Sequence, residues 1–137
     1  MIDQTDMEII KLLTQNSRMQ WQDIGEKVHL TGQAVKNRVD RLEKLGVIEG
    51  YTVKLNQDKL GMEIKAFVTV FMKTTDHASF KKYLMQSDLI NEAYRISGEG
   101  CYLLQVNTTS QKELLTFLDG VLKYGNYRVN LSIDKIK

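Results

Sequence analysis

Residues 31–46 read TGQAVKNRVDRLEKLG, a run that begins with threonine and ends with glycine. Thr31 is a favoured helix N-cap, and Gly46 stands where a left-handed residue commonly ends a helix. At about 100° per residue, Val35, Val39 and Leu42 share one side of such a helix. The opposite side has only polar and charged residues, namely Gln33, Lys36, Asn37, Asp40, Arg41 and Lys44. The run therefore predicts a helix with one packed face and one free face.

Two further helices are expected before this one. Apolar residues at helical spacing (Ile2, Ile9, Ile10 and Leu13) predict a first helix from about Asp3, with Asp3 and Asp6 near its positive end. A short second helix follows through Trp21, Ile24 and Val28, and the turn 29–31 joins it to the third. A tight turn between two helices, the second capped and basic, is typical of a helix-turn-helix. Trp21 has two interpretations, a lid on the core or a contact to a DNA phosphate, of which the lid is favoured.

The free face of the third helix has side chains suited to the major groove. Gln33 and Asn37 can pair with adenine edges, Lys36 and Arg41 with guanine or phosphate, and Lys44 with phosphate. The alternative is an ordinary solvated helix face, which the capped, tightly turned context disfavours. The expected DNA-binding residues are Thr31, Gln33, Lys36, Asn37, Arg38, Arg41 and Lys44.

Composition narrows the class of protein. The 137 residues have a net charge of only +2, so a DNA-binding face has to be a local patch. One cysteine and two histidines exclude a disulfide scaffold and a zinc finger. No apolar run reaches the length of a membrane helix, and no secretion signal is visible, so we expect a cytoplasmic protein. The sequence has no nucleophile with an adjacent base, no phosphate-binding glycine loop and no recognisable acid pair. We therefore expect neither an enzyme nor a cofactor or metal site.

Hydrophobic periodicity changes along the chain, which predicts two domains. Residues 1–50 form the helix-turn-helix, 51–62 a linker strand, and 63–137 a second domain. The segment from Val47 to Val53 reads as extended, either a wing or a strand, and the strand is preferred because only Lys54 is basic there.

The second domain alternates between strand and helix patterns. Strands are expected at 64–73, around Ala93–Ile96, at Tyr102–Val106 and at Tyr127–Ile133. Helices are expected at about 77–86, with Phe80, Tyr83 and Leu84 inward, and at about 111–123, with Leu114, Leu115, Leu118, Val121 and Leu122. This order predicts a ferredoxin-like βαββαβ fold, so the whole chain is α+β.

A ferredoxin-like sheet has both helices on one face and leaves the other open. Phe67 and Phe71 are expected on the open face, where exposed apolar area favours pairing of subunits. A two-fold dimer would also place two helix-turn-helix units on one DNA molecule.

The chain resembles the Lrp/AsnC family of regulators over essentially its full length. The matching residues are DQTD (3–6), II (9–10), Leu13, NSR (16–18), LT (30–31), Val35, RV (38–39), RLE (41–43) and GVIEGY (46–51). The resemblance implies a winged-type helix-turn-helix on double-stranded DNA, joined to a ferredoxin-like effector domain. It also implies dimers assembling into octamers, with amino-acid effectors bound between dimers.

The family's effector turn commonly reads glycine, acid, any residue, aspartate, and here it is Gly98, Glu99, Gly100 and Cys101. A neutral thiol at Cys101 cannot neutralise an ammonium group as an aspartate would. Glu99 and Cys101 are therefore either effector contacts or, equally, a solvated turn residue and a small packed hydrophobe. Cys101 as a redox sensor is a further alternative, disfavoured because no second cysteine can resolve it.

Three functions are compatible with these features. A sequence-specific transcriptional regulator modulated by an amino acid or related molecule is the favoured one. An architectural protein that binds DNA with little base selectivity is the second, and a ligand-sensing module without DNA binding is the third.

Overall fold

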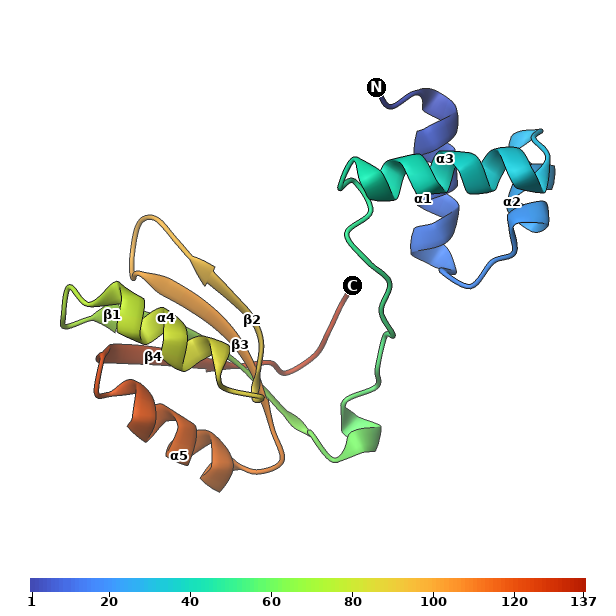
Figure 1. Cartoon of the computed structure of the whole chain (residues 1–137). Helices are drawn as coiled ribbons and strands as arrows, with labels where there is room; N and C mark the ends of the chain where they lie inside the picture. Colours follow the sequence, from blue (N-terminus) through green and yellow to red (C-terminus); the bar gives the residue numbers. More distant parts are fainter. The chain divides into compact units, whose positions relative to one another are not determined.

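The computed structural model describes residues 1–137, which form two compact units, Met1–Lys54 and Leu55–Lys137 (Figure 1). The first unit contains only helices, and the second contains a sheet with two helices. Each unit has its own hydrophobic core, so the two are described separately. No helix in the chain combines the length and hydropathy that crossing a bilayer requires.

The N-terminal unit consists of α1 (Gln4–Gln15), α2 (Trp21–Val28) and α3 (Gly32–Lys44), as the sequence predicts. Asp3 caps α1 through a capping box, in which Asp3 accepts from the backbone N–H of Asp6 and Asp6 accepts from that of Asp3. The three helices enclose a small core made of Ile9, Leu13, Ile24, Val35 and Val39. Trp21 is partly buried against this core, which confirms the lid interpretation.

The turn between α2 and α3 is fixed by backbone geometry. His29 has φ 61° and ends α2 in the left-handed region, and Thr31 then caps α3 by accepting from the N–H of Ala34. Gly25 lies against the carbonyl group of Leu30, where there is no room for a side chain. A substitution here would therefore displace the turn that orients α3.

The C-terminus of α3 is closed by a Schellman motif. Gly46 has φ 75°, its N–H donates to Glu43, and the N–H of Val47 donates to Leu42. The predicted stop at Gly46 is therefore confirmed, and α3 has a defined end on both sides.

The linker strand predicted over 51–62 is wrong for this chain. Residues 49–56 form neither helix nor strand, and Asp58–Leu60 form one 3₁₀ turn. A strand needs a neighbour to complete its backbone hydrogen bonds, and no segment of the chain pairs with this one. In this segment the Tyr51 hydroxyl donates a hydrogen bond to the Glu43 carboxylate on α3, at 3.0 Å.

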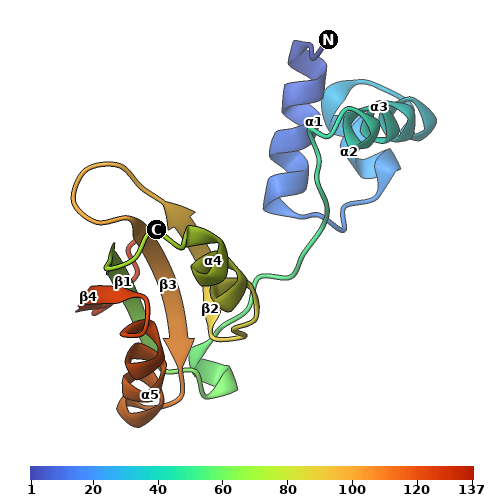
Figure 2. The ribbon, with the colours of Figure 1, turned by 60° about the vertical axis from the view of Figure 1, so that its left-hand side comes forward.

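The second unit is an antiparallel sheet in the order β2-β3-β1-β4, which confirms the ferredoxin-like prediction. Its elements are β1 (Ile64–Met72), α4 (His77–Met85), β2 (Ile90–Arg95), β3 (Tyr102–Thr108), α5 (Gln111–Val121) and β4 (Gly125–Leu131). Both helices cover the same face of the sheet (Figure 2).

The core of this unit lies between the sheet and its helices. Phe80 is completely buried and packs edge-on against Tyr102, with a ring-centroid distance of 4.9 Å. Among the leucines of the predicted second helix, Leu115 and Leu122 are exposed, because α5 turns Leu114, Phe117, Leu118 and Val121 to the sheet. Ile133 is fully exposed beyond the end of β4, and the strand begins and ends two residues earlier than predicted.

The other face of the sheet has no helix over it. Phe67 is 36% exposed and Phe71 is partly exposed, as the alternation in this strand predicts. Two cations lie against these rings, Lys65 over Phe67 and Arg128 over Phe71. The open face thus combines apolar and cationic groups.

Candidate nucleic-acid interface and effector turn

The helix α3 has the two-sided character that its sequence predicts. Val35, Val39 and Leu42 are completely buried and fix one side of the helix inward. The exposed residues on the other side, called here the outer face of α3, are Gln33, Lys36, Asn37 and Lys44. Four of the seven predicted DNA-binding residues therefore share one solvent-facing surface.

Three side chains of the outer face have partners one helical turn away on α3. The Gln33 amide donates to the Asn37 side-chain oxygen at 2.9 Å. The Lys36 ammonium lies 2.9 Å from Asp40, and this hydrogen bond raises the pKa of Lys36. Exposed pairs at this spacing contribute only a few tenths of a kcal/mol. Partners in a DNA groove can therefore displace them at little cost.

Arg38 and Arg41 lie elsewhere, against the N-terminal end of α1. The Arg38 guanidinium contacts Asp3 at 2.8 Å and Asp6 at 3.0 Å. Arg41 contacts Asp6 at 2.5 Å and also donates to the carbonyl oxygen of Met1 at 2.7 Å. The α1/α3 ion cluster, defined as Asp3, Asp6, Arg38 and Arg41, joins the two helices.

The two aspartates of this cluster are stabilised as carboxylates. Burial by itself would raise the pKa of Asp6, but donors from Asp3, Arg38 and Arg41 outweigh burial and lower it. The Arg38 side chain, followed by the backbone N–H of Asp6, lowers the pKa of Asp3. The cluster is therefore fully ionised at neutral pH.

Sequence reasoning placed these aspartates near the positive end of the first helix but did not identify them as partners of the arginines. The hydrogen bonds join residues 32 to 35 positions apart, a separation at which a sequence shows charges without showing their pairing. One signal was present, because Arg38 and Arg41 are three residues apart and so lie on one side of a helix.

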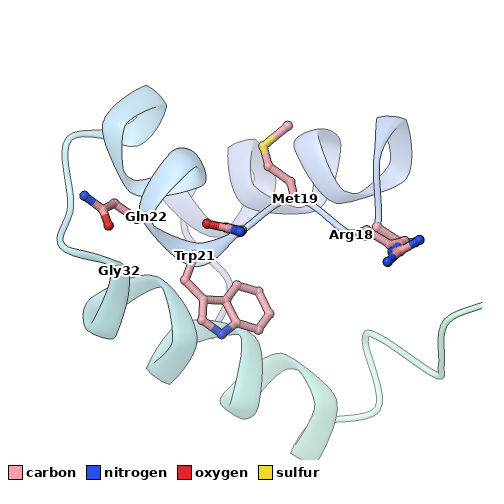
Figure 3. Close-up of a pocket in the computed structure, with 7 residues that line it drawn as sticks. Arg18, Met19, Trp21, Gln22 and Gly32 are labelled. Atoms are coloured by element: carbon pink, nitrogen blue, oxygen red, sulfur yellow. The ribbon is translucent and has the colours of Figure 1, made fainter.

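A shallow cleft of about 610 Å³ lies where the α1–α2 loop meets the start of α3 (Figure 3). It is lined by Ser17, Arg18, Met19, Gln20, Trp21, Gln22 and Gly32. Gln20 precedes α2 without capping it, so the first N–H groups of α2 have no side-chain acceptor there. Free N–H groups at a helix start, beside the exposed Arg18, suit an anionic oxygen.

The predicted effector residues form one turn between β2 and β3. Gly98 has φ 83° and Gly100 φ 88°, a conformation that glycine adopts without strain. A Cβ at Gly100 would also collide with the Thr69 side chain. Cys101 is half-buried, and its N–H donates to the Val70 carbonyl at 2.8 Å, so backbone hydrogen bonding fixes the end of the turn.

The Glu99 side chain projects from this turn and is 84% exposed, 3.7 Å from the Arg128 guanidinium on β4. The pair presents one anionic and one cationic group to solvent within reach of one small molecule. Sequence reasoning did not identify Arg128, because only the sheet register brings β4 beside this turn.

Both halves of the chain match known family models. Residues 2–43 match the model described as the AsnC-type helix-turn-helix domain. Residues 65–137 match the model described as the Lrp/AsnC ligand binding domain.

Curated relatives match the chain along nearly its whole length. It is 44% identical over 136 residues to HTH-type transcriptional regulator LrpB of Bacillus subtilis (strain 168), covering 99% of this chain and 91% of LrpB. It is 38% identical over 136 residues to LrpA of the same organism, covering 98% and 100% of the two chains.

Solved structures share the fold. B. subtilis LrpC superposes with a TM-score of 0.95 at 31% identity, covering 100% of this chain and 98% of that one. The complex of the Neisseria meningitidis regulator NMB0573 with L-Met superposes with a TM-score of 0.94 at 24% identity, covering 100% and 93%.

Proposed function

This chain belongs to the Lrp/AsnC family of helix-turn-helix transcriptional regulators, and we propose that the outer face of α3 reads its DNA target from the major groove. One observation supports this assignment above the others. The outer face projects hydrogen-bonding side chains into solvent from a helix whose opposite side is completely buried. A rigid helix with such a face fits the width of the B-DNA major groove.

Each side chain of the outer face has a role that follows from its chemistry. Gln33 and Asn37 offer amide groups that can pair bidentately with adenine, exchanging their mutual hydrogen bond for base contacts. Lys36 and Lys44 offer cations for guanine or phosphate. The same chemistry made Thr31, Arg38 and Arg41 candidates, but Thr31 caps the helix and the arginines contact α1.

Contacts to the DNA backbone are proposed at the cleft beside α2. Arg18 and the uncapped N–H groups of α2 would bind a phosphate there, next to the helix that enters the groove. Such contacts position a protein without reading sequence. The proposed role is regulatory rather than catalytic, and it is exercised in the cytoplasm.

One titration distinguishes the three candidate functions. The full chain is titrated with its own upstream DNA and with an unrelated fragment, at two salt concentrations. Tight binding to the upstream fragment alone supports the specific regulator. Equal, steeply salt-dependent binding to both would indicate an architectural protein, and binding to neither would indicate a ligand-sensing module.

Substitution Lys36→Ala is expected to weaken binding to the upstream fragment by about 1–3 kcal/mol if Lys36 contacts a base. If Lys36 contacts a phosphate, both fragments should bind more weakly, and the slope of log K against log salt should become shallower by about 1. Lys11→Ala, which removes an exposed cation from α1, is the control and should leave both affinities unchanged. Equal effects of the two substitutions would show that Lys36 does not touch DNA.

We further propose that the second unit binds an amino acid at the turn formed by Gly98, Glu99, Gly100 and Cys101. Glu99 and Arg128 are oppositely charged and 3.7 Å apart, which matches the ammonium and carboxylate groups of a free amino acid. The N. meningitidis regulator with this fold was determined with L-Met bound. Because Cys101 adds no charge, the ammonium group depends on Glu99 alone.

Pairing of subunits is proposed through the open face of the sheet. Phe67, Phe71 and the exposed Tyr94 leave apolar area there that association would bury. Dimers assembling into octamers are the expected form, and light scattering with and without a panel of amino acids tests both proposals. A monomeric mass under every condition would contradict the pairing, and an unchanged mass and melting temperature with every amino acid would contradict the effector.

A further inference from the structure

The two arginines of α3 are held by the α1/α3 ion cluster and not by DNA-facing contacts. Arg38 and Arg41 are only 30% and 40% exposed, whereas Lys36 on the same helix is 48% exposed. Their guanidinium groups donate to Asp3, which caps α1, and to Asp6 in its first turn. The four cationic side chains of α3 are thus divided into two lysines on the outer face and two arginines bound to α1.

Asp6 is the centre of this cluster. Its carboxylate is completely buried and accepts from the backbone N–H of Asp3, from Arg38 and from Arg41. No buried polar side-chain atom of the chain lacks a partner, so the charge is fully compensated. Removing one arginine would weaken the packing of α1 on α3, but the other arginine and the Asp3 N–H would still donate to the buried carboxylate.

This arrangement fixes how α3 is presented. Arg38 and Arg41 lie almost one turn apart, and both reach one carboxylate on α1. Two planar guanidinium groups held at one point restrict rotation of α3 about its axis. The restriction keeps the outer face turned to solvent.

We propose that Asp6 is a positioning residue for DNA recognition, which holds Arg38 and Arg41 against α1 and so withholds two cations from DNA. The inference rests on the proposed function of the outer face. Cation–phosphate contacts increase affinity for every DNA sequence equally. Withholding two of them lowers non-specific binding while Gln33 and Asn37 continue to discriminate, so Asp6 sets the ratio of specific to non-specific affinity.

The salt dependence of DNA binding tests this role. If Asp6 had a purely structural role, its substitution would not increase the number of phosphate contacts. The full-length Asp6→Asn variant is compared with Glu8→Gln, which removes one carboxylate from the exposed side of the same helix. Affinity for the upstream and unrelated fragments is measured from 50 to 200 mM salt, roughly the range in which phosphate contacts are resolved. Circular dichroism establishes that each variant is folded.

Asp6→Asn is expected to steepen the slope of log K against log salt by about 1 to 2, because each released arginine that reaches a phosphate adds about 0.9. Binding to the unrelated fragment should tighten by about tenfold, and the ratio of the two affinities should fall. Adding Arg41→Gln to Asp6→Asn removes one released arginine, so the slope should become shallower again by about 1. Glu8→Gln should leave the slope unchanged.

Two results would overturn the inference while leaving the proposed function intact. One is a folded Asp6→Asn variant with the slope of the wild-type protein. The other is a loss of about 0.9 in slope from Arg38→Gln or Arg41→Gln alone, which would place those arginines on phosphates already. If Asp6→Asn does not fold, the single arginine variants decide the question, and unchanged slopes support the inference. Wild-type protein that binds neither fragment would instead refute the proposed function.

Discussion

The double variant Gln33→Ala/Asn37→Ala is expected to bind the upstream fragment about 3 kcal/mol more weakly relative to the unrelated fragment, roughly two orders of magnitude in affinity. A bidentate amide–adenine pair contributes about 1–3 kcal/mol of discrimination, and these two side chains bond to each other, so their effects are not additive. Binding to the unrelated fragment should barely change, since neither side chain is charged. Parallel titrations of both fragments measure the difference.

The control is Gln4→Ala/Gln15→Ala, which removes two exposed amides from α1. Alanine is the best helix former, so neither double variant should unfold its helix. An equal loss of affinity for both fragments in Gln33→Ala/Asn37→Ala would show that these residues support binding without reading the sequence.

Gly25→Ala is expected to destabilise the N-terminal unit by about 3 kcal/mol, at the upper end of what overpacking costs. In an ordinary helix this substitution would stabilise by up to about 1 kcal/mol. Here the added Cβ would overlap the Leu30 carbonyl oxygen and lie 3.2 Å from its carbon and 3.3 Å from the Thr31 carbonyl carbon. These are backbone atoms of the turn before α3, which cannot move aside without displacing that helix.

Gly50→Ala is the matched control, because nothing lies within 4 Å of a Cβ there and its φ is unremarkable. Its effect should stay within about 0.5 kcal/mol. Thermal unfolding followed by circular dichroism gives both values, and DNA titration should show lost binding for Gly25→Ala alone. A Gly25→Ala variant as stable as the wild-type protein would mean that the α2–α3 turn is looser than the structure shows.

Local features of this protein were predictable, because they depend on neighbouring residues. Thr31 and Gly46 mark the two ends of α3 through hydrogen bonds to residues three or four positions away, and the valine spacing gives its buried side. The ferredoxin-like order follows in the same way from alternating strand and helix patterns. Such signals survive in any single sequence.

Features that depend on distant partners were not predictable. Asp6 and Arg41 are 35 residues apart, and no feature of the sequence around either residue indicates that they pair. The segment 51–56 has the alternation of a strand but no neighbour in its own chain with which to pair. On α5, spacing alone could not decide whether Leu115 or Phe117 faces the sheet, because both belong to a largely apolar helix.

Cysteine modification can locate DNA on the surface of the N-terminal unit. Asn37→Cys and Gln15→Cys are each introduced together with Cys101→Ser, which removes the native thiol. The rate of maleimide reaction is then measured with and without saturating upstream DNA. Contact by the outer face of α3 predicts that DNA protects position 37 and leaves position 15 reactive, whereas equal reactivity of position 37 in free and bound protein would contradict it.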